Sequence, residues 1–195
     1  MVSSFISSIL MSLFLSSLFL SSLLLTPPCH AATSPELLKL ACTVDQVTDP
    51  KTWNYTLCIK VLESNPKVAS SPNLPTLAIN IIQLGISNVT NTQKYIQKTL
   101  TSKNIESSLR IALKACDQSY DLILKSFQSA FGEVKDDEDY ESASYDLSLA
   151  RTDYLNSCQQ ALASNKVEDL SISTGSKFVI LFSAAADAVC TRLDV

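Results

Sequence analysis

Histidine is almost absent from this chain of 195 residues, and glycine is rare. The single histidine, His30, lies in an uncharged N-terminal segment, so histidine-based triads, Cys–His dyads and the usual zinc enzymes are excluded. Gly85, Gly132 and Gly175 lie far apart and form no phosphate-binding loop. Paired carboxylates could still serve a glycosidase, but the acidic residues fall mostly in predicted exposed turns. The sequence therefore predicts a protein that is not an enzyme and binds no cofactor or metal.

Charge is absent from residues 1–32, where a run of leucine, serine and phenylalanine extends from Phe5 to Leu25. Pro27-Pro28 ends the run, and Ala31-Ala32 offers small residues that suit a signal peptidase. We interpret 1–32 as a cleaved signal peptide, although the usual basic residue before the run is missing. The run is also long enough to span a bilayer, so an uncleaved anchor is the alternative. The small residues after the run, with no basic stop-transfer cluster, favour cleavage.

All 15 basic and 19 acidic residues lie after this segment, which makes residues 33–195 mildly acidic. No basic patch of the kind that binds nucleic acid is present, so that class of partner is not expected. About 160 residues is the size of one domain with a hydrophobic core. In a secreted protein the oxidising compartment also favours disulfides.

The first part of this domain, 33–67, has the pattern of a short helical hairpin. Ser34-Pro35-Glu36 is a typical helix start, and Tyr55 to Ser64 forms a second helix. Cys42 and Cys58 face each other across the hairpin. Helices this short are marginal alone in water, and a disulfide around a loop of this size contributes about 3 kcal/mol in the chain-entropy model.

Two longer helices of nearly equal length are predicted between Leu109 and Leu162, folded back on each other. Gly132 and the charged residues 133–139 mark a helix stop followed by a turn. A helix rises about 24 Å from Cys116 to Gly132, and the return helix descends about 27 Å to Cys158, so the two sulfurs reach the same level. A disulfide between them would contribute about 4 kcal/mol, whereas two buried free cysteines are the alternative.

Two more helices complete the prediction, one from about Leu77 to Leu100 and one from Phe178 to Leu193. The apolar run of the last helix is too short to cross a membrane and Asp187 interrupts it, so we expect it to pack in the core. No strand pattern competes. The predicted fold is all-α: an antiparallel up-down-up-down four-helix bundle over 73–195, preceded by the short helical hairpin and held by two disulfides.

Three further residues are candidates for modification or pairing. Cys190 has no predicted partner, and a buried free thiol is favoured over an intermolecular disulfide because no neighbouring base indicates reactivity. Asn54-Tyr55-Thr56 and Asn88-Val89-Thr90 are N-glycosylation sequons. Asn54 lies beside an exposed turn and is the better candidate. Asn88 falls on a predicted core face, which argues against its use or against that face.

Several phrases around the cysteines form a recognisable set. They are Cys42-Thr43 with Tyr55, Cys58, Leu62 and Asn65-Pro66; Ala112-Leu113-Lys114-Ala115-Cys116-Asp117 with Tyr120; and Asp139-Tyr140-Glu141-Ser142-Ala143 with Leu147-Ser148-Leu149-Ala150 and Cys158. With these phrases the chain resembles the plant pectin methylesterase inhibitor and invertase inhibitor family. The resemblance implies a stoichiometric inhibitor whose helical bundle covers the substrate cleft of a pectin methylesterase or an acid invertase. We expect it in the apoplast or cell wall, alternatively in the vacuole, as a free monomer without a membrane partner.

The choice of target rests on one phrase. Invertase inhibitors of this family characteristically carry Pro-Lys-Phe in the turn between the third and fourth helices, where this chain has Tyr140-Glu141-Ser142. Lys177-Phe178 supplies two of those letters but lies in the wrong connection. The Asp-Tyr phrase is closer to pectin methylesterase inhibitors, so pectin methylesterase is the predicted target and invertase the alternative.

The acidic turn from Glu133 to Glu141 is the candidate contact with a basic enzyme surface. The contact residues would be Asp136, Asp137, Glu138, Asp139, Tyr140 and Glu141. A solvated charged loop is the alternative. Two other kinds of protein are alternatives. One is a helical domain that binds a small apolar ligand, which the densely apolar inner faces disfavour. The other is a structural protein, but the sequence has no repeat or composition bias that would indicate one.

Overall fold

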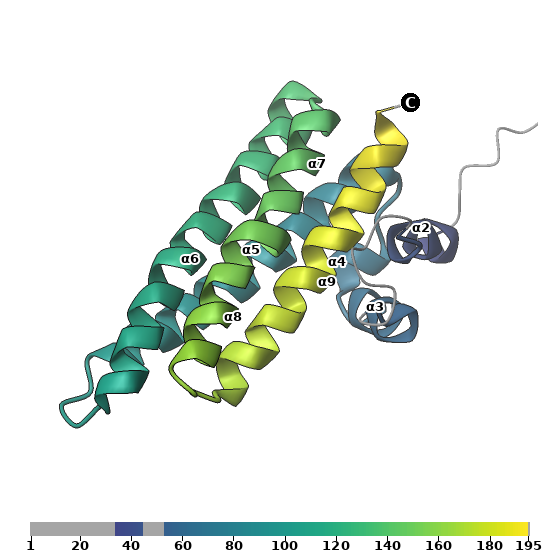
Figure 1. Ribbon diagram of the computed structural model, residues 1–195. Helices are drawn as coiled ribbons and strands as arrows, with labels where there is room; N and C mark the ends of the chain where they lie inside the picture. Colours follow the sequence, from purple (N-terminus) through teal and green to yellow (C-terminus); the bar gives the residue numbers. More distant parts are fainter. Residues whose placement is uncertain (1–33, 45–52, 195) are drawn as a thin grey trace, which may run out of the picture. The chain divides into compact units, whose positions relative to one another are not determined.

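The structure is a computed structural model that describes residues 34–44 and 53–194, so the predicted signal peptide lies outside it. These described residues form helices and no strand (Figure 1). Residues Ala32–Val195 make up one compact unit. The predicted all-α class is confirmed.

Two short helices, α2 (Ser34–Cys42) and α3 (Tyr55–Glu63), and a single turn, α4 (Pro66–Ala69), come before the long elements. The long elements are α5 (Leu74–Leu100); α6 (Ser107–Gly132) with its π-helical extension η1 (Glu133–Asp137); α7 (Tyr140–Leu149), η2 (Ala150–Tyr154) and α8 (Leu155–Ser164) in one line; and α9 (Leu170–Leu193).

Asparagine or aspartate begins most of these helices by accepting a backbone N–H. Asn54 Oδ1 accepts from Leu57 N at 2.9 Å, and Asp139 Oδ1 accepts from Ser142 N at 3.1 Å. Asn65, Asn73 and Asp169 do the same for α4, α5 and α9. Each cap satisfies a donor that has no partner within its own helix, and so fixes where the chain changes direction.

The long helices pack antiparallel to their neighbours. Two hydrogen bonds show that α5 and α9 are antiparallel. Asn88 bonds Gly175, and Tyr95, which follows Asn88 in α5, bonds Asp169, which precedes Gly175. The disulfide between Cys116, early in α6, and Cys158, late in α8, shows the same reversal. Figure 1 shows these helices side by side, with α9 beside α7 and α8.

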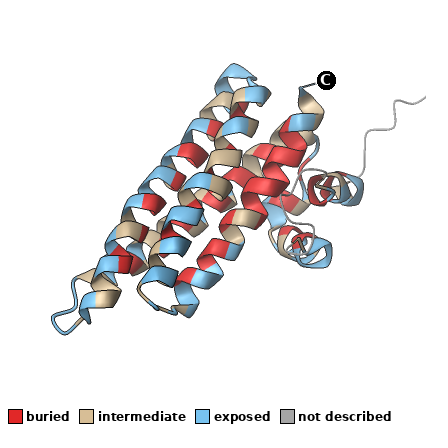
Figure 2. Ribbon diagram, in the orientation of Figure 1, coloured by how far each residue is buried: buried red, intermediate tan, exposed pale blue. Residues whose placement is uncertain are grey.

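The core lies between these helices and is closed by α9, whose buried residues form the long red band in Figure 2. Tyr120 and Phe127 of α6 are its largest fully buried side chains. Two glycines of the core lie where helices approach closely. A Cβ on Gly85 would lie 2.1 Å from Phe127 Cε1, and one on Gly175 would lie 2.3 Å from Thr92 Oγ1.

The predicted helix stop at Gly132 is wrong. Gly132 has right-handed helical angles, φ −64° and ψ −47°, and the helix continues to Asp137. Val134 is buried, so the extra turn adds an apolar contact to the core. The chain reverses instead at Glu138, which has φ 54° and donates its backbone N–H to Glu133 O.

Other predicted boundaries also need correction. Helix α6 begins at Ser107, two residues before the predicted Leu109, and α9 begins at Leu170 rather than near Phe178, because Asp169 caps it. With this earlier start α9 is long and apolar enough to cross a membrane, contrary to the prediction, but 72% of its most apolar window is buried inside the protein. Burial on this scale is what a core helix shows, so the predicted role in packing stands.

Candidate functional site

The acidic turn is a short, structured reversal between α6 and α7. Residues 133–141 contain six carboxylates and one lysine. The side chain of Asp139 caps α7, and the bond from Ser142 N lowers the pKa of Asp139 below its usual range. This carboxylate therefore stays negative in mildly acidic solution.

The side chains of the turn project into solvent. Asp136, Asp137, Glu138, Asp139 and Glu141 are exposed, and Tyr140 is half-buried. Lys135 Nζ lies 3.5 Å from Asp136 Oδ1 and 5.5 Å from the centre of the Phe131 ring, so one cation partly offsets the negative charge. The structure thus brings all the predicted contact residues together on one exposed, preorganised turn.

Glu133 differs from the other acids of this turn because one of its oxygens is buried. Oε1 accepts from Ser129 Oγ at 3.1 Å, whereas Oε2 has no hydrogen-bond partner among the described residues. Burial raises the pKa of Glu133 above its usual range, and the carboxylates of Asp146, Asp139 and Asp137 act in the same direction.

Both expected disulfides are present in the structure. Cys42 and Cys58 join α2 to α3 with their Cα atoms 5.8 Å apart, and Cys116 and Cys158 join α6 to α8 with their Cα atoms 4.3 Å apart. Cys190 is free and buried, and burial raises its pKa to about 12. Its thiol is therefore protonated at neutral pH and lies away from the surface that an intermolecular disulfide requires.

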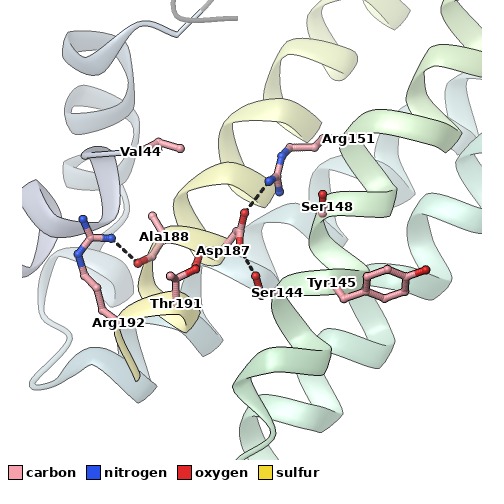
Figure 3. Close-up of a pocket in the computed structure, with 9 residues that line it drawn as sticks. All are labelled: Val44, Ser144, Tyr145, Ser148, Arg151, Asp187, Ala188, Thr191 and Arg192. Carbon is pink, nitrogen blue, oxygen red and sulfur yellow. Dashed lines mark hydrogen bonds and ion pairs between the residues drawn. The ribbon is translucent and has the colours of Figure 1, made fainter. Parts of the chain in front are cut away.

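A cavity of about 190 Å³ opens between α7 and α9, close to the end of α2 (Figure 3). A nearly buried ion pair forms one wall: Arg151 Nη2 lies 2.5 Å from Asp187 Oδ2, and the two side chains are 9% and 12% exposed. Ser144 Oγ donates a hydrogen bond to the other oxygen of Asp187. The second guanidinium nitrogen, Arg151 Nη1, is buried and has no partner among the described residues.

The sequence does not identify the partner of Asp187. There it interrupts an apolar run, and a carboxylate on a buried face signals that a cation or hydroxyl must meet it. Arg151 lies in η2, where the wider π-helical turn carries it beside α9. The pair joins η2 to α9, and the Ser144 bond joins α7 to α9, so the first effect of these contacts is to fix how the helices pack.

Two open grooves also lie on the surface of the described residues. One, of about 750 Å³, lies between α8 and the start of α9 beside Leu170, which is 82% exposed. The other, of about 400 Å³, lies between α2 and α3. Among the described residues no group of three or more His, Cys, Asp or Glu side chains could hold a metal ion.

Comparisons with known proteins extend these observations. The chain is 32% identical over 119 residues to the cell wall/vacuolar inhibitor of fructosidase 2 of Arabidopsis thaliana, an alignment that covers 60% of this chain and 63% of that protein. The chain thus matches less than two thirds of this relative's length.

Two solved structures share the fold. A pectin methylesterase inhibitor from Arabidopsis thaliana matches with a TM-score of 0.59 and 21% identity over 80% of this chain and 95% of its own. A mutant form A of an Arabidopsis pectin methylesterase inhibitor matches with a TM-score of 0.64 and 21% identity over 72% of this chain and 91% of its own.

The family described as plant invertase/pectin methylesterase inhibitor matches residues 36–186, which is most of the chain. This family consists of inhibitors rather than enzymes, in agreement with a sequence that offers no catalytic set. The resemblance drawn from the cysteine phrases is thereby confirmed. The chain belongs to the plant invertase/pectin methylesterase inhibitor family.

Proposed function

We propose that this protein is a secreted inhibitor of a plant cell-wall carbohydrate-active enzyme, with pectin methylesterase as its first target. The observation that carries the proposal is the family match over residues 36–186. A rigid body suits the role, because a preorganised surface loses little conformational entropy on docking. Inhibition would follow from occlusion of the substrate cleft at a ratio of one inhibitor to one enzyme.

Acid invertase is the second candidate target, and a specific observation favours it: the relative with 32% identity is named an inhibitor of fructosidase. Against it stands the turn itself, where Tyr140-Glu141-Ser142 replaces the Pro-Lys-Phe phrase characteristic of invertase inhibitors. Tyr140 begins α7 directly after the Asp139 cap, so this position belongs to a helix start rather than to a loop.

Inhibition assays decide between these targets. Recombinant residues 33–195 would be titrated against a pectin methylesterase, a cell-wall invertase and a vacuolar invertase, each at a concentration above the expected Kd. We expect pectin methylesterase activity to fall linearly and to end near one equivalent, with both invertases unaffected. Inhibition of an invertase alone would move the assignment to the second candidate, and no effect on any of the three would refute the inhibitor proposal.

The acidic turn is the proposed contact surface. Six carboxylates on one reversal attract a basic enzyme surface over a distance and so raise the association rate. Neutralising Asp136, Asp137, Glu138 and Asp139 to their amides should slow association about tenfold at low salt and flatten its salt dependence. Asparagine at position 139 still caps α7, so the fold is retained.

A matched control carries the same change in net charge elsewhere. Glu63→Gln, Glu106→Gln, Asp121→Asn and Asp153→Asn neutralise four exposed acids outside the turn. Stopped-flow association with the target should separate the two quadruple variants. Equal association rates for both would show that overall charge, and not the turn, guides docking.

Secretion to the apoplast or cell wall is part of the proposal, with the vacuole as the alternative, and residues 1–32 would act as the signal peptide. N-terminal sequencing of the protein from plant cells should begin near residue 32 or 33. A chain that retains residues 1–32 and sediments with membranes would establish an anchor instead.

A further inference from the structure

We propose that Asn54 carries the N-linked glycan of this protein and that Asn88 remains unmodified. The inference rests on passage through the secretory pathway, which is part of the proposed function. Both residues begin sequons, and the sequence favours Asn54 only because it lies beside a predicted exposed turn. The structure distinguishes them, because one amide faces solvent and the other joins two core helices.

The chemistry uses the side-chain amide nitrogen. Asn54 Nδ2 attacks C1 of an oligosaccharide that is linked through pyrophosphate to a lipid. An N–C1 bond forms, the C1–O bond to the pyrophosphate breaks, Nδ2 releases one proton, and the lipid pyrophosphate leaves. The amide carbonyl is unchanged by this transfer.

Asn54 meets the geometric requirements of an acceptor. It is exposed and lies directly before α3, where its Oδ1 accepts from Leu57 N at 2.9 Å. The cap uses only the side-chain oxygen Oδ1, and Nδ2 takes no part in that hydrogen bond. A sugar on Nδ2 is therefore compatible with the cap. Thr56, which completes the sequon, is exposed on the first turn of the same helix.

The surroundings of Asn54 also suit a glycan. Its neighbours Tyr55 and Leu57 are 44% and 41% exposed, so two large apolar side chains lie at the surface beside it. Beside them the groove between α2 and α3 has a volume of about 400 Å³ and is lined in part by Tyr55, Thr56 and Ile59. The first sugars therefore have open space and apolar surface to cover.

Asn88 is placed in the opposite way. It lies in the middle of α5 and its Nδ2 donates to Gly175 O on α9 at 3.0 Å. One turn further along α5, Thr92 packs closely against Gly175. A Cβ added to Gly175 would lie 2.3 Å from Thr92 Oγ1. Asn88 is half-buried, so a sugar ring on its Nδ2 would have to fit beside the bond to Gly175 O where two helices pack closely. Because the glycan is added before the chain folds, a chain modified at Asn88 would fail to pack α9.

The test uses the complete secreted chain, with residues 1–32 replaced by the signal peptide of another secreted protein, in a eukaryotic host. Intact mass should show one glycan. Enzymatic deglycosylation in heavy-oxygen water should label the peptide that contains Asn54 and leave the Asn88 peptide unlabelled. A glycan on Asn88, or none at either residue from a host that glycosylates a control protein, would overturn the proposal.

Paired variants remove each sequon without removing its asparagine. Thr56→Ala keeps the Asn54 cap and should abolish the glycan mass, whereas Thr90→Ala should leave the mass unchanged. Asn54→Asp also keeps the cap and should abolish the mass, which guards against an effect of misfolding. Since the borrowed signal peptide directs export, a failure of residues 1–32 to do so would refute only the secretion proposal.

Discussion

The α2–α3 hairpin and the α5–α9 bundle are held together in different ways. The helices of the hairpin have nine residues each, and Cys42, Cys58 and Leu62 are among its few fully buried side chains. Helices α5 and α6 have 27 and 26 residues, and each buries a continuous face in the shared core. A nine-residue helix is marginal in water, so the hairpin depends on its crosslink and on contacts with the bundle.

Those contacts are both apolar and polar. Leu37, Leu38 and Ala41 of α2 are buried in the same core cluster as the bundle helices. Arg192 Nη2 at the end of α9 donates to Thr43 O at 3.0 Å, whereas Trp53 Nε1 donates to Cys42 O at 3.0 Å within the hairpin. The bundle unites its longer helices through many more buried apolar side chains and the Arg151–Asp187 pair. We infer that the bundle unfolds as one cooperative unit and that the hairpin opens locally at a lower free energy.

The largest effect is expected from the buried ion pair of the bundle. Asp187→Ala leaves the Arg151 guanidinium buried without its counter-ion, which costs about 3–5 kcal/mol of unfolding free energy. Urea unfolding would measure the loss. The double variant Arg151→Met with Asp187→Leu should recover much of it, because both charges are then gone. An Asp187→Ala protein as stable as wild type would show that the pair lies in water rather than in the core.

The two disulfides provide the most direct comparison of hairpin and bundle. Their sequence separations are 42 and 16 residues, which correspond to about 4 and about 3 kcal/mol in the chain-entropy model. Replacing Cys116 and Cys158 by alanine should lower the global free energy of unfolding by nearly the full amount. Replacing Cys42 and Cys58 should act mainly on hydrogen exchange in α2 and α3, with a smaller change in the urea midpoint.

Cys190 reports on global opening in the same experiment. Its thiol is buried and its pKa is raised to about 12, so alkylation at pH 8 requires exposure of α9. We expect the rate of Cys190 alkylation to rise when Cys116 and Cys158 are replaced and to stay near wild type when the hairpin pair is replaced. A similar rise in both variants would mean that hairpin and bundle unfold together.

Much of this architecture could be predicted from the sequence because helix geometry is regular. A fixed rise per residue places Cys116 and Cys158 at one level, and apolar spacing identifies the buried faces of the long helices. The start of α9 was also readable, since Asp169 before an apolar run is a helix cap. The apolar spacing alone predicts a later start, at Phe178.

Other features depend on contacts between distant residues and could not be read from spacing. Glycine at position 132 suggested a stop, but burial of Val134 favours another helical turn and moves the reversal to Glu138. The Arg151–Asp187 pair joins residues 36 apart through a π-helical turn that no periodicity indicates. Asn88, predicted on a core face, is half-buried rather than buried, and only the structure shows its amide bonded to α9.

A smaller and local effect is expected at the start of the hairpin's second helix. Asn54→Ala removes the bond from Leu57 N and should destabilise α3 by about 1 kcal/mol. Because α3 belongs to the hairpin, amide exchange in α3 should quicken while the global urea midpoint barely moves. The matched change Asn73→Ala removes the cap of α5 and should lower the midpoint, since α5 belongs to the bundle. Equal midpoints for the two variants would contradict separate unfolding.

The smallest effect is a pH dependence at the acidic end of the bundle. The pKa of Glu133 is raised in the folded protein, so folding favours its protonated form. Its contribution to stability is therefore fully present below the usual glutamate pKa, about 4.3, and is lost as pH rises through the folded value. Glu133→Gln removes that loss, so the variant should gain stability over wild type as pH increases from 4 to 7, by urea unfolding. Asp139→Asn should show the opposite slope at lower pH, because the pKa of Asp139 is lowered, so its contribution is present above the usual aspartate pKa of about 3.9 and is lost as pH falls below it. Parallel pH profiles for both variants would show that these carboxylates titrate alike, as they would in an unstructured loop rather than in a rigid turn.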